Sequence, residues 1–253
     1  MQSLFIALSM YSKIPVPGVE WNEKNMKYAL CFFPVVGVII GAVQYLFFML
    51  CNMTGLGNLF KSLIAAVIPV VITGGIHMDG YLDTVDAICS YADKDKRLEI
   101  LKDPDSGAFA IIYGIVYFIC CVACFSELDN AAVIFVCMGY AISRTLSALS
   151  IAAFPKAKNT GLVAAFQDGA HRRNVTVIMC IYIIAEFIIT LITGGAAAAI
   201  IMFITAGVAF LIHYRLCMSK FGGITGDLAG FFLQICELMI LAGFMIFLSS
   251  NCK

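Results

Sequence analysis

Long apolar runs, separated by short polar segments, dominate the chain. Seven of these runs are near the roughly 20 residues that an α-helix needs to cross a bilayer. The second run is short, and we expect its helix to continue through His77 and past Asp86. The pattern predicts an all-α protein, a polytopic integral membrane helical bundle of about seven transmembrane helices. The runs cover residues 28–50, 63–76, 108–125, 131–153, 175–193, 197–212 and 228–248.

The first 20 residues do not fit this pattern of spans. Residues 1–12 are apolar but lack the basic start and small-residue cleavage site of a signal peptide. Pro15 and Pro17 follow and stop a helix. We expect residues 1–20 to form an interfacial helix with a proline-containing segment after it. Because no internal repeat or polar linker divides the chain, we expect residues 1–253 to form a single membrane-embedded domain.

Composition narrows the class of protein. Of 253 residues, 62% are hydrophobic and 13% charged, the net charge is zero, and the mean hydropathy is +0.96. These values exclude a disordered chain and a basic nucleic-acid binder, so we expect no nucleic-acid partner. The charged residues are also too few to cover the surface of a soluble globular protein of this size. We therefore expect the lipid bilayer to surround the chain. Most of the 11 cysteines lie in apolar runs, where cysteine acts as a small hydrophobe.

Basic residues alternate between the connecting segments. Of the 16 Lys and Arg residues, 13 lie in the N-terminal arm and in the second, fourth and sixth loops. Two lie on the opposite side, and Arg144 is inside a span. Because loops rich in Lys and Arg stay in the cytoplasm, this pattern predicts a cytoplasmic N-terminus in the cell membrane.

Carboxylates are concentrated in one segment. Eight of the 16 acids lie between residues 74 and 107. Asp79, Asp83 and Asp86 are spaced i, i+4, i+7, which places them on one face of a helix. Their repulsion requires a cation, and hard oxygen ligands suit Mg²⁺, Mn²⁺ or Ca²⁺. The alternative is an acidic cap where a helix leaves the bilayer.

A second group of charges follows this cluster. Glu99 and Asp103 are again i, i+4, and we expect their helix to present them toward the first acids. Arg97 and Lys102 lie beside them. The acidic side chains can hold a metal ion and the basic side chains can hold a phosphate. The segment therefore predicts a metal-assisted phosphoryl-transfer site. Gly74 and Gly75, which precede the acids, are expected to let another backbone segment approach closely, because glycine has no side chain. Residues 93–96 are expected to form a solvated loop.

Three further features complete the predicted site. Arg144 is basic within a span, so an acid or an anionic substrate is expected beside it. Glu237 is an intramembrane acid after a glycine-rich segment, whose backbone amides are expected to reach an anion. The three histidines do not have the spacing of a zinc-binding motif, and only His77 is close in sequence to the acidic cluster. These features, together with the family resemblance given below, assign the following residues to the substrate: His77, Arg97, Lys102, Arg144, Gly223, Thr225, Gly226, Asp227 and Glu237.

These charges gather at one predicted membrane face. A transporter is expected to place charges near the bilayer midplane and often to have repeated halves. The pattern therefore favours an enzyme whose active site faces the cytoplasm.

At these residues the sequence resembles the adenosylcobinamide-GDP ribazoletransferases, also called cobalamin (5′-phosphate) synthases. The resemblance runs through most of the chain. Ala87 stands where that pattern usually has glycine. The matching stretches are SKIPVP (12–17), GGIHMDGYLDTVDA (74–87), RLEILKDPDSGAFA (97–110), Ser143-Arg144 and GGITGDLAG (222–230) followed by Glu237.

The resemblance implies an Mg²⁺-dependent membrane enzyme of cobalamin (vitamin B12) biosynthesis. Such enzymes join adenosylcobinamide-GDP to α-ribazole or its 5′-phosphate and release GMP. A ribose hydroxyl attacks the phosphoryl group on the cobinamide arm. The sequence leaves open the base of the lower ligand, the choice between nucleoside and nucleotide, the number of metal ions, and whether the chain forms a homo-oligomer.

The D-x-x-D of Asp83 and Asp86 also resembles the CDP-alcohol phosphotransferases, which displace a nucleotide in a similar way. By this analogy Asp79, Asp83 and Asp86 are the expected metal ligands. Asp103 is the expected base for the attacking hydroxyl, with Glu99 as the second choice and Asp83 part of the catalytic group. A CDP-alcohol phosphotransferase-like phospholipid enzyme and a divalent-cation transporter stay open as alternatives.

Overall fold

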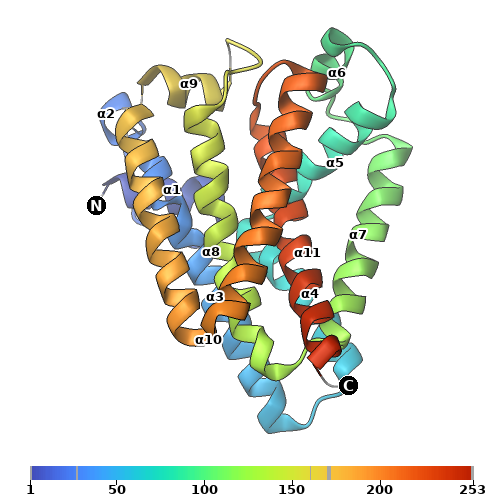
Figure 1. Ribbon diagram of the computed structural model, residues 1–253. Coiled ribbons are helices and arrows are strands. Elements are labelled where there is room, and N and C mark those ends of the chain that lie inside the picture. Colours follow the sequence, from blue (N-terminus) through green and yellow to red (C-terminus); the bar gives the residue numbers. More distant parts are fainter. Residues whose placement is uncertain (1, 27, 160, 170–171, 252–253) are drawn as a thin grey trace.

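The computed structural model describes residues 2–26, 28–159, 161–169 and 172–251. Apart from one isolated bridge between Lys156 and Ile224, the regular structure in these ranges is helical, which confirms the predicted all-α class (Figure 1). The elements are α1 (Gln2–Tyr11), α2 (Glu23–Met26), η1 (Ala29–Phe32), α3 (Phe33–Thr54), α4 (Asn58–Thr73), α5 (Ile76–Cys89), α6 (Lys94–Ile100), α7 (Ala108–Ser126), α8 (Asn130–Ala153), α9 (Leu162–Gly169), α10 (Arg172–Leu216), η2 (Cys217–Phe221) and α11 (Gly226–Asn251).

Several of these helices are long and apolar enough to cross a membrane. Five helical stretches meet this condition, and α4 and α5 together make a sixth if they are one bent span. The chain is therefore a multi-pass membrane protein. The five stretches are Ala29–Thr54, Ala108–Ser126, Asn130–Ala153, Arg172–Phe221 and Gly226–Phe247.

The junction of α4 and α5 is sharply bent. The two helices meet at 99°, so the expectation of one helix running past Asp86 is wrong. Gly74 (φ 65°) and Gly75 (φ 83°) are both in the left-handed region, which glycine adopts without the steric cost of a Cβ atom. A Cβ on Gly75 would meet nothing within 4 Å. At Gly75, therefore, the glycine serves the bend and not the close backbone approach that we expected.

The helix α10 is a hairpin of two limbs. At Gly195 the backbone leaves the helical region (φ 72°, ψ −175°), and Figure 1 shows the chain reversing direction there. The rings of Phe187 and Phe203 are 5.2 Å apart, whereas a straight helix would separate these residues by about 24 Å. With α4–α5 as one bent span, the helical passes number seven. Seven membrane crossings and the cytoplasmic N-terminus stay predictions.

Helix α8 is the central helix, since it packs against α3, α10 and α11. Its contact with α3 depends on glycine. A Cβ on Gly37 would lie 2.2 Å from the carbonyl oxygen of Tyr140, and one on Gly41 would lie 2.3 Å from that of Cys137. Membrane helices commonly approach closely through such small residues. This contact fixes α3 against the centre of the bundle.

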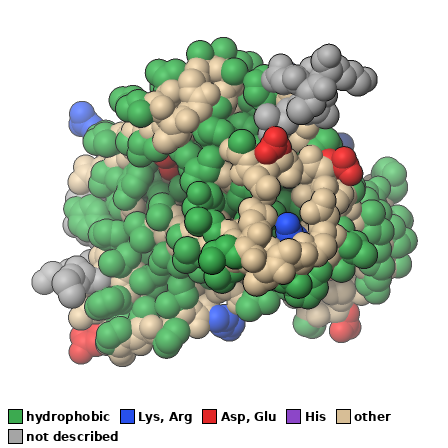
Figure 2. Space-filling model, turned by 90° about the horizontal axis from the view of Figure 1, so that it is seen from below, with side chains coloured by type: hydrophobic (Ala, Val, Ile, Leu, Met, Phe, Trp, Pro, Cys, Tyr) green, Lys and Arg blue, Asp and Glu red, His purple; other side chains and the backbone are tan. Residues whose placement is uncertain are grey.

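The outer faces of the bundle are apolar. Leu50, Ile119 and Ile192 are each at least 60% exposed, as expected for side chains in contact with lipid tails. The N-terminal helix α1 packs into the protein through Ile6 and Ala7, which are fully buried. Its predicted location along the membrane face stays a prediction. Viewed from the end near the C-terminus, the surface has few, scattered charges among apolar side chains (Figure 2).

The three loops that were predicted to share one side meet at one end of the bundle, at the top of Figure 1. The Nζ of Lys158, in the loop after α8, donates to the carbonyl of Leu98 in α6 at 2.7 Å. The amide of Ile224, before α11, donates to the carbonyl of Pro155 at 2.8 Å. The segment around α6, the loop after α8 and the segment before α11 therefore enclose a common space.

The contact between α3 and α8 gives a prediction about stability. Gly37→Leu forces a side chain against backbone atoms of α8, and we expect it to lower the free energy of unfolding by at least about 2 kcal/mol. Gly207→Ala is the control, because a Cβ there meets nothing within 4 Å. Thermal unfolding in detergent measures both. Equal melting temperatures for the two variants would contradict the account.

Candidate active site

A cavity of about 350 Å³ lies where the three loops meet. Helix faces from α1, α3, α5, α8, α9 and α11 complete its wall. Leu233 is seven residues into α11, so the cavity extends roughly 10 Å along that helix. Six residues that the sequence assigned to the site line it: His77, Asp79, Lys102, Thr225, Gly226 and Asp227.

Two glycines bring α5 and α11 together at this cavity. A Cβ on Gly80 would lie 2.9 Å from the Cα of Asp227. A Cβ on Gly230 would lie 3.0 Å from the carbonyl oxygen of His77. Because only glycine permits this approach, the two acid-bearing helices come close enough for Asp79 and Asp227 to line one cavity.

Four carboxylates share this region. Asp79, Asp83 and Asp86 all lie on α5, as the spacing predicted. The charge of Asp83 interacts with those of Asp79, Asp86 and Asp227. Among the residues that the structure describes, the ion pairs are Lys96–Glu99 and Arg144–Glu237, so none of the four acids is paired there with Lys or Arg. The carboxylates repel one another, and a bound cation would offset this repulsion.

Asp86 has a second, structural role. Its Oδ2 accepts from the amide of Gly107 at 2.6 Å, and its Oδ1 accepts from the amide of Ala110 at 2.9 Å. These bonds satisfy amides at the start of α7, which otherwise lack helical partners. A Cβ on Gly107 would lie 2.7 Å from Asp86 Oδ1. Asp86 therefore ties α7 to α5, a role that its spacing did not predict.

Two lysines supply positive charge to the cavity lining. Lys102 is exposed and Lys158 is half-buried. Burial and the charge of Lys102 lower the pKa of Lys158, whereas the carboxylate of Asp227 raises it. Sequence reasoning missed Lys158 as a site residue. The available signal was its loop, which the charge pattern had placed on the same side as the acidic segment.

The glycine-rich segment before α11 is used differently from the prediction. The hydroxyl of Thr225 accepts from the amide of Leu228 at 3.2 Å, which caps α11, and it donates to Asp227 Oδ2 at 3.4 Å. The amide of Gly223 donates to the carbonyl of Cys217 at 3.0 Å. That amide is therefore engaged within the protein, and Gly223 is absent from the cavity lining.

The acids in and after α6 do not line the cavity. Helix α6 ends at Ile100, so Asp103 follows the helix and accepts from the amide of Asp105 at 3.1 Å. Glu99 is exposed and pairs with Lys96 at 2.8 Å. Arg97 donates to the carbonyl of Lys220 at 3.5 Å. Asp103, Glu99 and Arg97 do not line the cavity, and the expected helical pairing of Glu99 with Asp103 is wrong.

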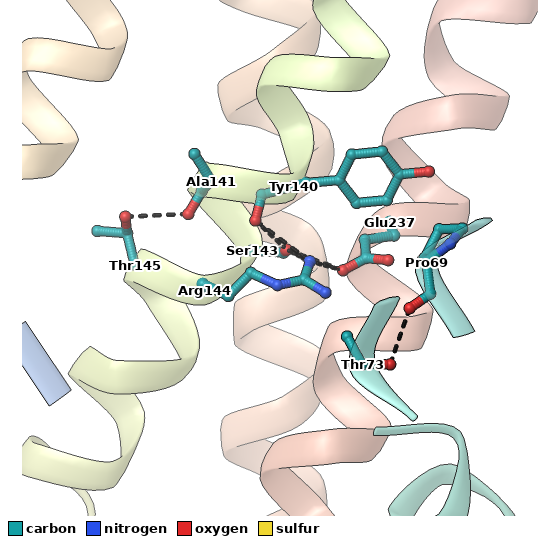
Figure 3. Close-up of polar contacts among 8 residues, drawn as sticks. All are labelled: Pro69, Thr73, Tyr140, Ala141, Ser143, Arg144, Thr145 and Glu237. Carbon is teal, nitrogen blue, oxygen red and sulfur yellow. Dashed lines mark hydrogen bonds and ion pairs between the residues drawn. The ribbon is translucent and has the colours of Figure 1, made fainter. Parts of the chain in front are cut away.

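Arg144 and Glu237 form a buried ion pair between α8 and α11 (Figure 3). Ser143 donates to Glu237 Oε1 at 3.0 Å, and Arg144 donates to the carbonyl of Tyr140 at 3.2 Å. The sequence predicted either an acidic side chain or an anionic substrate beside Arg144, and the structure places the acidic side chain of Glu237 there. Both side chains lie outside the cavity lining.

The acids fit a magnesium ion by their chemistry. In the described part of the chain, no three His, Cys, Asp or Glu side chains converge as a ligand set. Mg²⁺ typically binds one or two carboxylates and takes its other ligands from water and substrate phosphates. Asp79 lines the cavity together with the two lysines, whereas Asp83 and Asp86 are outside its lining. The charge of Asp83 interacts with that of Asp79, so these two unpaired carboxylates meet that requirement.

Fold and cavity together define a class: a multi-pass α-helical membrane protein with a charged cavity at one end of its bundle. The family model for cobalamin-5-phosphate synthase matches residues 3–245. The chain therefore belongs to the cobalamin-5-phosphate synthase family.

Three curated relatives bear the name adenosylcobinamide-GDP ribazoletransferase. The relative from Lachnoclostridium phytofermentans is 48% identical and covers 94% of this chain and 91% of its own length. Relatives from Clostridium botulinum and Fusobacterium nucleatum are 31% and 30% identical, and each covers 97% of this chain and 98% of its own length. No solved structure matches this chain.

The buried ion pair gives a prediction about stability. Glu237→Gln leaves the Arg144 guanidinium buried without its counter-ion, which typically costs about 3–5 kcal/mol. The double variant Arg144→Met with Glu237→Met removes both charges, and we expect it to unfold at a higher temperature than Glu237→Gln. Thermal unfolding in detergent compares them. A double variant less stable than Glu237→Gln would contradict this account.

Proposed function

We propose that this chain joins adenosylcobinamide-GDP to α-ribazole, or to its 5′-phosphate, at the cavity between α5, α8 and α11, with release of GMP. The family membership and the names of the relatives support this reaction. The observation that carries the location is the cavity itself, which combines the carboxylates Asp79 and Asp227 with the ammonium groups of Lys102 and Lys158. Phosphoryl transfer needs both kinds of charge.

We assign the binding of Mg²⁺ to Asp79 and Asp83, with Asp86 as a further candidate ligand. When bound, Mg²⁺ would neutralise negative charge on the diphosphate. The support is the group of unpaired carboxylates on α5. Asp86 is the weaker candidate, because its oxygens already accept two amides of α7.

The lysines are suited to hold the diphosphate. Lys158 Nζ is oriented by its bond to the carbonyl of Leu98 and retains two further protons for phosphate oxygens. Lys102 lines the same cavity. Positive charge here stabilises the GMP leaving group as the bond to the cobinamide phosphoryl group breaks.

The proton of the attacking ribose hydroxyl needs an acceptor within the cavity. Asp227 lines the cavity, whereas Asp103 and Glu99 do not. Asp227 is therefore a better candidate for the general base than Asp103. Its carboxylate is held by the Thr225 hydroxyl at the start of α11.

We also propose that the cavity faces the cytoplasm from the cell membrane. The loops around it are those with most of the Lys and Arg residues, and such loops stay in the cytoplasm. This orientation gives adenosylcobinamide-GDP and α-ribazole access from the cytosol.

An assay with purified protein tests the reaction. Incubation with adenosylcobinamide-GDP, α-ribazole and Mg²⁺ should release GMP, and removal of the metal by EDTA should abolish the release. A phospholipid phosphotransferase would consume a lipid headgroup alcohol instead, and a transporter would move divalent metal into proteoliposomes. Absence of GMP from a folded sample would refute the proposal.

Two substitutions test the metal ligands. We expect Asp79→Asn and Asp83→Asn each to lower turnover by at least about a hundredfold, because an amide holds a divalent cation less well than a carboxylate. Asp95→Asn is the control, since Asp95 is exposed in the first turn of α6 and outside the cavity. Turnover measured at several Mg²⁺ concentrations checks this. Normal turnover in both variants would remove these acids from the site.

A third substitution tests the phosphate contact. Lys158→Met should raise the KM for adenosylcobinamide-GDP about tenfold or more, because a charged hydrogen bond to the diphosphate is lost. Lys61→Met is the matched control: Lys61 lies near the start of α4 and donates to Asn52 Oδ1 at 3.2 Å. An unchanged KM in Lys158→Met would exclude this contact.

A further inference from the structure

The cavity has two chemically different parts. Its charged residues, Asp79, Lys102, Lys158 and Asp227, are exposed or half-buried. The other part is buried and mainly apolar or aromatic. Its members include Tyr11, Phe33, Ile151, Phe166 and Leu233, each at most 7% exposed.

Two buried polar side chains in this apolar part lack partners. His77 is 3% exposed and Ser147 is fully buried. Neither ring nitrogen of His77 has a hydrogen-bond partner among the described residues, and neither has the hydroxyl of Ser147. A buried polar group without a hydrogen-bond partner is unfavourable, because it has lost its bonds to water. Both residues line the cavity, so a ligand in the cavity can satisfy them.

Two aromatic rings, those of Tyr11 and Phe33, lie beside His77. The centroids of the Phe33 and His77 rings are 5.6 Å apart, and those of Tyr11 and His77 are 6.1 Å apart. The rings of Tyr11 and Phe33 are themselves 4.2 Å apart. Such a cluster favours a flat, apolar ligand. The N-terminal helix α1 therefore contributes to the cavity wall through Tyr11.

We propose that this buried part, formed around His77, Ser147, Tyr11 and Phe33, binds the base of the ribazole substrate, a flat and largely apolar benzimidazole. This inference rests on the proposed function and assigns one half of the cavity to one of the two substrates. The imidazole of His77 and the hydroxyl of Ser147 supply the donor for the free ring nitrogen of the base. The charged part then holds the diphosphate of the other substrate.

The choice between the two bases follows from their polar groups. Guanine has a carbonyl, a ring N–H, an amino group and further ring nitrogens, and each loses free energy if buried without a partner. Among the described side chains of the buried part, only His77 and Ser147 are buried polar groups without partners. A benzimidazole riboside has one free ring nitrogen in its base, and its remaining surface is apolar. The three unpaired atoms of His77 and Ser147 are too few for all the polar groups of guanine, whereas one donor among them is enough for the single free nitrogen of the benzimidazole.

Two conservative substitutions test the subsite in the full-length purified protein. His77→Phe keeps an aromatic ring, and Ser147→Ala removes one oxygen. Because neither polar group bonds within the described protein, neither change removes an internal hydrogen bond. Each should raise the KM for α-ribazole about tenfold, and the KM for adenosylcobinamide-GDP should change less than about twofold.

Matched controls lie outside the cavity. His213→Phe replaces another buried histidine, and Ser150→Ala replaces the serine of α8 whose hydroxyl donates to the Ser147 carbonyl at 2.7 Å. Both should leave the KM for α-ribazole within about twofold of its original value. Melting temperatures verify folding, and Ser147→Ala alone decides the test if His77→Phe does not fold.

The outcomes separate this subsite from the reaction itself. If the unaltered protein releases no GMP, the proposed function fails. If it is active and the folded variants raise the KM for adenosylcobinamide-GDP instead, or leave the KM for α-ribazole unchanged, the base subsite is overturned. A selective rise for α-ribazole supports it.

Discussion

The close packing of α5 against α11 is the constraint on which the candidate site depends. Gly80 and Gly230 let the two backbones approach to a distance at which a single Cβ atom would clash. This approach places acids from two distant parts of the chain beside one cavity. The bend at Gly74-Gly75 sets the direction of α5, and the capping of α7 by Asp86 fixes its other end. Without these contacts the acids of α5 and α11 would not line one cavity.

The arrangement of charge follows from the cost of burying it. Inside the bundle the guanidinium of Arg144 is neutralised by Glu237, since an unpaired buried charge is strongly unfavourable. At the loop end, Asp79 is exposed and Asp227 is half-buried, and neither forms such an ion pair among the described residues. An unpaired carboxylate is tolerable there because water and a bound cation can solvate it. The Arg144–Glu237 ion pair thus joins α8 to α11, whereas the charged side chains that line the cavity stay available for a substrate.

Much of the fold could be predicted from the apolar runs, because the length of a span and the spacing of Asp79, Asp83 and Asp86 follow directly from helical geometry. The bend before α5 was missed because a helical pattern continues across Gly74-Gly75 even though both residues have positive φ. For the candidate site, the spacing of the acids predicted their common place on α5, and one of them, Asp79, lines the cavity. Lys158 was missed, because its place in the cavity depends on how distant loops meet, which no local pattern encodes.

A structure of the protein bound to adenosylcobinamide-GDP with Mg²⁺, determined by cryo-electron microscopy with Asp227→Asn to slow turnover, tests the central claim most directly. The account predicts density for the diphosphate between the carboxylate of Asp79 and the ammonium group of Lys158, with the buried part around His77 free for the second substrate. Density for the diphosphate outside this cavity, or for guanine against His77, would contradict it.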